Sequence, residues 1–122
     1  MLESIQPKTR IEIIDYVVSH FEKNPRSLSS HGCLYNGPNG AMCGFAILCA
    51  NPEKLIEDWS PISLIQNGKA ILKPEFSGQS GDFYCDIQML HDNRGYWKIT
   101  PEGNELTQIG IERVEELKEK HK

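Results

Sequence analysis

The sequence has no hydrophobic run long enough to span a membrane. Its longest apolar stretch, Ala41 to Ala50, is interrupted by Gly44 and falls far short of the roughly 20 residues that a spanning helix needs. The first residues, Met1 to Ser4, also lack the basic and then apolar layout of a signal peptide. We therefore expect a cytoplasmic protein with no membrane partner.

Positive charge is also scarce. The chain carries 13 Lys and Arg residues against 17 Asp and Glu residues, and the basic residues are scattered along it. The basic stripe of a protein that binds nucleic acid is therefore missing, and we expect no nucleic-acid polymer as a partner. Because 122 residues are few for two separate cores, we predict one domain over residues 1–122. So small a core leaves apolar surface to cover, which favours a homo-oligomer.

Apolar residues recur at helical spacing between Pro7 and Asn24, and the pair Asn24-Pro25 should end this first predicted helix. The pairs Asn51-Pro52 and Ser60-Pro61 each place a capping side chain before a proline, which predicts the starts of two short helices. Asn67-Gly68 should end the second of them.

The second half of the chain continues this pattern. Residues 69–76 predict a short edge strand or extended segment, and a further helix should run to about His91 on a buried face that starts at Phe83. Residues 96–99 predict an extended segment that returns to the core. Thr100-Pro101-Glu102 then predicts the start of the last helix. Its inner stripe would be Leu106, Ile109, Val114 and Leu117.

Residues 33–43 have the composition of a hairpin. Asn36-Gly37 and Asn39-Gly40 tolerate positive φ, and Pro38 fixes the chain between them. Cys33 and Cys43 would then lie opposite one another on neighbouring strands. The predicted fold is α+β, with helices packed around a small antiparallel hairpin or three-stranded sheet.

The hairpin motif resembles that of a family of small uncharacterised proteins from bacteriophages and bacterial genomes. The motif reads Cys33-x-Tyr35-x-Gly37-Pro38-x-Gly40-x-x-Cys43, and the resemblance continues through Glu53 and through Leu90-His91-Asp92 with Trp97. Members of this family usually carry Ala-x-Gly after the second cysteine, whereas this chain has Gly44-Phe45-Ala46. The resemblance implies a phage or mobile-element setting, hence the cytoplasm of a host cell, and implies nothing about chemistry.

Two candidate sites use the cysteines, of which there are four. His31, Cys33, Cys43 and Cys49 offer the ligands that zinc prefers, but no C-x-x-C pair occurs, and buried thiols are the simpler interpretation. A nucleophilic Cys33 or Cys43, activated by His31 or His91, is the second candidate, for which the sequence shows no contact.

A third candidate is a binding site for a small anionic ligand, formed by the hairpin loop and by the turn after residue 90. Backbone amides of the loop, aromatic rings and a guanidinium would contact the ligand. The predicted ligand-binding residues are Tyr35, Asn36, Asn39, Gly40, His91, Arg94 and Trp97.

The function predicted from these features is that of a phage-type accessory binding protein. Without a catalytic constellation or a cofactor motif, we expect a protein that is not an enzyme, needs no cofactor and sequesters a small nucleotide-derived signal of the host. One alternative is a protein-binding inhibitor of a host enzyme or defence protein. A second is a thiol- or zinc-dependent enzyme that uses the Cys/His cluster.

Overall fold

The computed structural model describes residues 8–24, 43–57, 59–92 and 94–122. Within these residues the structure has four α-helices and one antiparallel pair of short strands, which confirms the predicted α+β class with the smaller of the two sheets expected. The helices are α1 (Arg10–Lys23), α2 (Pro61–Gln66), α3 (Gly81–Asp92) and α4 (Gln108–Lys120). The strands are β1 (Trp97–Thr100) and β2 (Gly103–Leu106).

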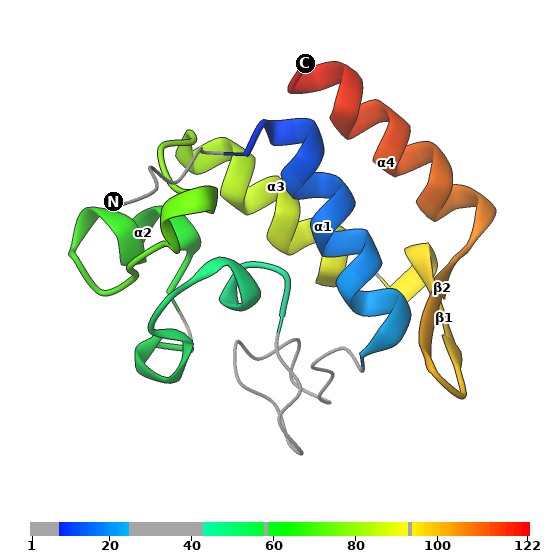
Figure 1. Cartoon of the computed structure of the whole chain (residues 1–122), viewed down its shortest axis with the longest axis horizontal. Helices are drawn as coiled ribbons and strands as arrows, with labels where there is room; N and C mark the ends of the chain where they lie inside the picture. The colour runs from blue at the N-terminus through cyan, green and yellow to red at the C-terminus, as the bar shows by residue number, and fades with distance from the viewer. Residues whose placement is uncertain (1–7, 25–42, 58, 93) are drawn as a thin grey trace, which may run out of the picture.

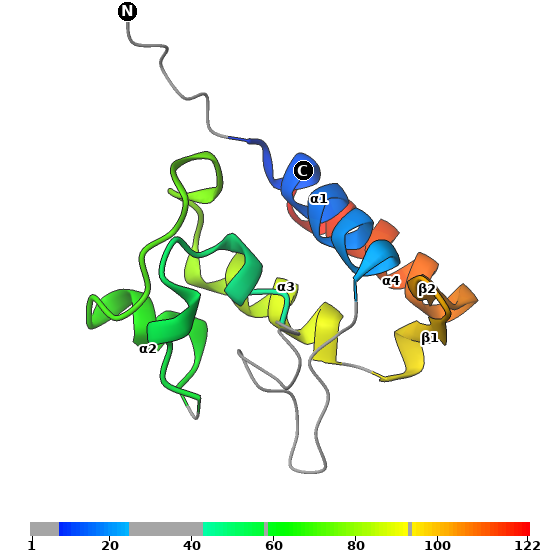
Figure 2. The same ribbon diagram turned by 60° about the horizontal axis from the view of Figure 1, so that its bottom comes forward.

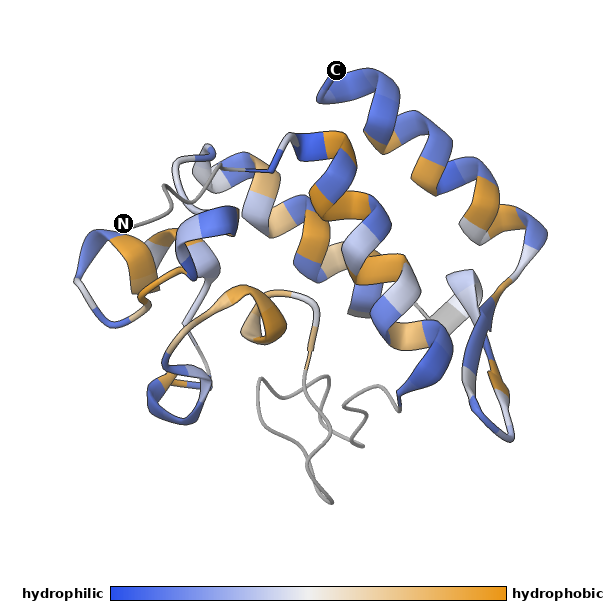
Figure 3. Cartoon of the chain, in the orientation of Figure 1, coloured by the Kyte–Doolittle hydropathy of each residue, from blue (hydrophilic) through white to orange (hydrophobic). Residues whose placement is uncertain are grey.

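The helix α3 lies at the centre of the arrangement. Helices α1 and α4 pack against each other and against α3, and α2 packs against α3 on its other side (Figures 1 and 2). The hairpin lies beside the C-terminal end of α1 (Figure 1). Apolar residues line the faces between these elements and the segment 43–50, whereas the C-terminal end of α4 is polar (Figure 3).

Local signals explain the limits of α1. Thr9 caps the helix by accepting a hydrogen bond from the Glu12 backbone N–H, and the Glu12 carboxylate accepts one from the Thr9 N–H, which forms a capping box. The helix ends at Lys23, before an extended Asn24, as expected for the residue that precedes Pro25. The buried residues of α1 are Ile13, Ile14, Val17 and Phe21.

The predicted hairpin at residues 33–43 lies outside the described residues, and the hairpin that the structure shows is at residues 97–106. The prediction that Thr100-Pro101-Glu102 opens the last helix is therefore wrong. These residues form the turn of the hairpin, where the Thr100 hydroxyl accepts a hydrogen bond from Gly103 N–H at 3.1 Å. A proline after a hydroxyl residue is favoured in tight turns as well as at helix starts, so the local signal is ambiguous.

The last helix begins at Gln108 instead, and Thr107 is its N-cap. Val114 and Leu117 are buried as predicted, but Leu106 belongs to β2 and Ile109 is 61% exposed. The helix ends against α3, where His121 Nε2 and Lys120 Nζ each lie 2.7 Å from an oxygen of Asp86. This contact fixes the C-terminal end of α4.

Residues 43–49 form an apolar segment that is buried throughout. At Gly44 this segment passes so close to α3 that a Cβ atom would lie 2.9 Å from the backbone oxygen of Ile87. Packing therefore requires a glycine at position 44.

Two further predictions hold only in part. Asn51-Pro52 starts a single 3₁₀ turn, Pro52–Lys54, rather than a helix, while Ser60-Pro61 starts α2 as predicted. Gly68, with a φ of 68°, follows the end of α2. Residues 69–76 make one bridge, between Cys49 and Leu72, and then a 3₁₀ turn.

Among the described residues, no helix has both the length and the apolar character that crossing a membrane requires.

Candidate functional site

Most of the predicted ligand-binding residues cannot be placed. Tyr35, Asn36, Asn39 and Gly40 lie outside the described residues, and Arg94 is placed only as the first residue of a 3₁₀ turn. The structure places the other two predicted residues, His91 and Trp97.

His91 and Trp97 are both buried in the core. The His91 ring packs on Phe21, with ring centroids 4.8 Å apart, and the Trp97 indole N–H donates to the backbone oxygen of Leu90 at 2.9 Å. In the described structure both rings hold α3, α1 and the hairpin together rather than line a hollow.

The predicted zinc ligands His31 and Cys33 also lie outside the described residues, whereas Cys43 and Cys49 are buried in the apolar segment. The Cys49 thiol donates to the backbone oxygen of Phe45 at 3.5 Å. Burial raises the pKa of Cys49 to about 12, although the nearby Lys73 favours the thiolate. This thiol is therefore protonated at neutral pH and unsuited to nucleophilic attack. The described part of the chain contains no group of three or more His, Cys, Asp or Glu residues that could hold a metal ion.

A different set of side chains converges on a hollow between α1 and the apolar segment, which we name the Tyr16–Lys73 pocket. It has a volume of about 360 Å³, at the lower end of the range for small-molecule sites. Its lining residues are Tyr16, His20, Ala46, Ile47, Cys49, Ala50, Pro52, Glu53 and Lys73. Segment 46–52 supplies the apolar lining residues, and Tyr16, His20, Glu53 and Lys73 supply the polar groups.

Helix periodicity places two of these side chains. Tyr16 and His20 are four residues apart on α1, so they lie one above the other on one face, with ring centroids 6.3 Å apart. Tyr16 packs on Phe76 at 4.7 Å, and His20 meets the edge of Phe21 at 4.9 Å. Both rings are therefore held in place by aromatic neighbours.

Backbone pairing places Lys73. Its N–H donates to the Leu48 oxygen at 2.9 Å, and Ala50 N–H donates to the Ile71 oxygen at 2.7 Å. These bonds and the Cys49–Leu72 bridge lay the segment around residue 72 along the apolar segment. The Lys73 side chain is half-buried at the edge of the hollow.

The polar head groups of these three residues are not used to hold the fold. Within the described part of the chain, the Tyr16 hydroxyl, the His20 ring nitrogens and the Lys73 ammonium form no hydrogen bond or ion pair. Polar groups that converge on an apolar hollow without protein partners are the usual sign of a small-molecule site.

The environment also sets the charge of the pocket. Burial lowers the pKa of His20 below its ordinary 6.5, and the positive charge of Lys73 and the neighbouring His91 lower it further. The pKa of Tyr16 is raised by burial and then by the carboxylate of Glu75. At neutral pH the pocket therefore offers a neutral imidazole, a neutral phenol and one ammonium group, with Glu53 as the carboxylate among its lining residues.

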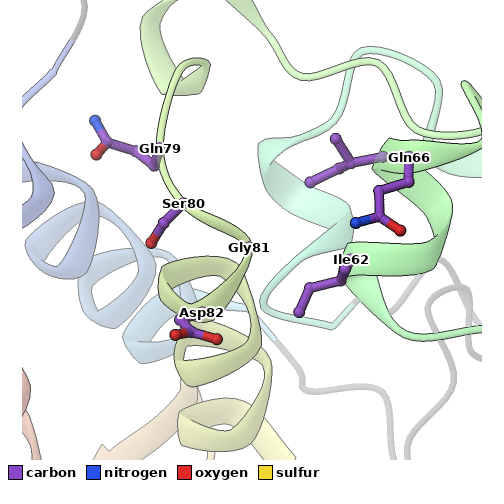
Figure 4. Close-up of a pocket in the computed structure, with 7 residues that line it drawn as sticks. Ile62, Gln66, Gln79, Ser80, Gly81 and Asp82 are labelled. Atoms are coloured by element: carbon purple, nitrogen blue, oxygen red, sulfur yellow. The ribbon is translucent and has the colours of Figure 1, made fainter.

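A second hollow, of about 350 Å³, lies between α2 and the start of α3 (Figure 4). Ile62 and Gln66 extend toward it from α2, whereas the side chains of Gln79 and Ser80 point away from α2. The Ser80 hydroxyl is already used to cap α3, since it accepts a hydrogen bond from Phe83 N–H at 3.2 Å. Gln66 and Asp82 complete the polar lining, but Gln79 and Ser80 point away from α2 and Ser80 is engaged in the cap, so we regard this hollow as the weaker candidate.

Sequence reasoning missed the Tyr16–Lys73 pocket. Tyr16 and His20 lie at the border between the apolar and polar faces of α1, a helix that the sequence predicts. An aromatic ring and an imidazole one helical turn apart could therefore have indicated a binding site on this face. No local pattern indicates Lys73, because its place depends on pairing with residues that are more than 20 positions away.

Comparison of the chain with family models, with curated proteins and with solved structures finds no match. The resemblance of the hairpin motif to small phage proteins stays a prediction. Function is therefore inferred from the geometry and charge of the pocket.

Proposed function

We propose that this chain is an accessory binding protein of phage type, which sequesters a small anionic, nucleotide-derived molecule of the host in the Tyr16–Lys73 pocket. The observation that carries the proposal is that three side chains whose polar groups no described residue engages line one hollow together with apolar residues.

Each group has a role that its chemistry suits. The Lys73 ammonium binds the anionic group of the ligand, since a charge-assisted hydrogen bond is roughly twice as strong as a neutral one. The neutral His20 imidazole offers one donor and one acceptor beside it. The Tyr16 ring and the apolar lining residues contact the flat part of the ligand.

Binding is proposed rather than catalysis because the thiol in this pocket is not a nucleophile at neutral pH. Cys49 is 1% exposed and its pKa is about 12. The proposal needs no cofactor, and the phage setting that the hairpin motif implies supports a role in sequestering a host molecule.

The alternative, a protein-binding inhibitor or a self-associating chain, is supported by a different observation. Four large apolar side chains are more than half exposed: Ile71, Met89, Ile99 and Ile109. Such residues favour a protein partner or a second copy of the chain when they form one patch.

Isothermal titration calorimetry with the four common ribonucleoside monophosphates tests the proposed function. We expect binding by the natural chain and a loss of about tenfold or more in Lys73→Met, because one charge-assisted hydrogen bond is worth about 1.5–3 kcal/mol. Methionine keeps the apolar stem of the lysine and removes its charge.

Lys69→Met is the matched control, because Lys69 is exposed and does not line the pocket. It should bind as the natural chain does. Failure of the natural chain to bind any of the four nucleotides, or equal affinities of the two variants, would contradict the proposed function.

A further inference from the structure

The Tyr16–Lys73 pocket is lined by two groups of opposite charge that do not pair with each other. Lys73 and Glu53 both border it, yet no ion pair joins them within 4.0 Å among the described residues. Glu53 is exposed and Lys73 is half-buried, so both charges are accessible to a molecule that enters the hollow.

The backbone that carries these two residues is tied together by one side chain. The Asn51 amide N–H donates to the Lys69 oxygen at 2.9 Å, and its carbonyl oxygen accepts from Ile71 N–H at 2.9 Å. These bonds connect the 3₁₀ turn that contains Glu53 to the segment that contains Lys73. These bonds fix the relative position of the two backbone segments from which the two separate charges extend.

This separation constrains what the pocket can take. A ligand that is anionic throughout would satisfy Lys73 but would bring negative charge toward Glu53, which is unfavourable. A ligand with an anionic end and a hydrogen-bond donor end satisfies both groups at once. A carboxylate presents two oxygens, so it is best matched by two adjacent N–H donors in one plane.

We propose that Glu53 accepts hydrogen bonds from the donor edge of a nucleobase while Lys73 binds the phosphate of the same molecule, so that the pocket prefers guanine nucleotides. Guanine presents an N–H and an amino group side by side, whereas adenine presents a single amino group flanked by acceptors. This inference rests on the proposed function, since it names the ligand class of the same pocket.

Paired titrations with GMP and AMP test the inference. We expect the natural chain to bind GMP about fivefold or more tighter than AMP, because a good bidentate pair discriminates by about 1–3 kcal/mol in nucleic-acid recognition. IMP, which keeps the ring N–H and lacks the amino group, should bind with intermediate affinity. In Glu53→Gln the ratio of GMP to AMP affinity should fall close to one, and circular dichroism would verify that this exposed position leaves the fold intact.

Glu75→Gln is the matched control. Glu75 is a nearby carboxylate that acts on Tyr16 but does not line the pocket, so its removal should leave the ratio unchanged. Equal affinities of the natural chain for GMP and AMP, or a preference that survives in Glu53→Gln, would overturn the inference while the proposed function stands. Absence of binding to every nucleotide would overturn both.

Discussion

Asn104 joins the β1–β2 hairpin to the end of α1, and its replacement by alanine should destabilise the protein strongly. Its side chain is 4% exposed, and its amide group donates to the Phe21 oxygen at 2.8 Å and to the Asn24 oxygen at 2.9 Å. Both acceptors are at the C-terminal end of α1, where carbonyl groups have no partner within the helix. Asn104 therefore acts as a C-terminal cap supplied from a distant part of the chain.

The magnitude follows from the two carbonyl groups that Asn104→Ala leaves without a partner. A buried polar group without a hydrogen bond costs about 1–3 kcal/mol. The bond to Phe21 is buried, whereas the bond to Asn24 is partly exposed, so water offsets part of the second loss. We expect the free energy of unfolding to fall by roughly 2–4 kcal/mol, a large share of the 5–15 kcal/mol typical of a domain.

Urea unfolding followed by circular dichroism measures this loss. Asn67→Ala is the matched control, because its side chain also donates to a helix carbonyl, that of Ser63 at 2.8 Å, but in an exposed position. It should cost less than about 1 kcal/mol. Asn104→Asp should destabilise more than alanine at neutral pH, since it turns a carboxylate toward two carbonyl oxygens. If Asn104→Ala costs no more than Asn67→Ala, the link between hairpin and helix is wrong.

Two further changes test other contacts of the fold. Burial alone would raise the pKa of Asp86, but hydrogen bonds from Lys120 and His121 outweigh burial and hold that pKa below its ordinary 3.8. The stability that the carboxylate contributes is therefore present above pH 3.8 and is lost as the pH falls through the folded-state pKa. Asp86→Asn should therefore destabilise at pH 7, and its unfolding midpoint should converge with that of the natural chain as the pH falls below 3.8; a constant difference down to pH 2 would refute this. Gly44→Ala should lower the free energy of unfolding by about 1–3 kcal/mol, because its Cβ would lie 2.9 Å from the Ile87 backbone oxygen. An unchanged thermal midpoint would contradict the requirement for glycine at this position.

Elements whose signals are local could be predicted from the sequence. The limits of α1 follow from apolar spacing and from Pro25, and the ends of α2 follow from Ser60 and Gly68. The turn at residues 100–103 could not be distinguished from a helix start in this way. What decides it is distant: at Gly103 a Cβ would lie 2.7 Å from the Glu22 oxygen, so α1 itself packs on the turn.

The candidate site likewise combines residues that local signals place with residues that only distant contacts place. Tyr16 and His20 share one face of a helix that periodicity predicts, so their proximity could have been inferred. Lys73 and Glu53 reach the pocket only because Asn51 and the Cys49–Leu72 bridge join segments that are far apart in the chain. Conversely, Trp97 and His91 had the chemistry of ligand contacts, but both are buried, because tertiary packing rather than residue type decides which rings reach a surface.

The most direct test of the central claim is to locate where a nucleotide binds, by titrating the ¹⁵N-labelled chain with GMP and following its amide resonances. The pocket predicts that the largest shift changes fall on residues 46–50, on Lys73 and on the face of α1 that carries Tyr16 and His20. The hollow at Ser80 to Asp82 serves as an internal reference that should not respond. Shift changes centred on that hollow, or none at any concentration of GMP, would contradict the account.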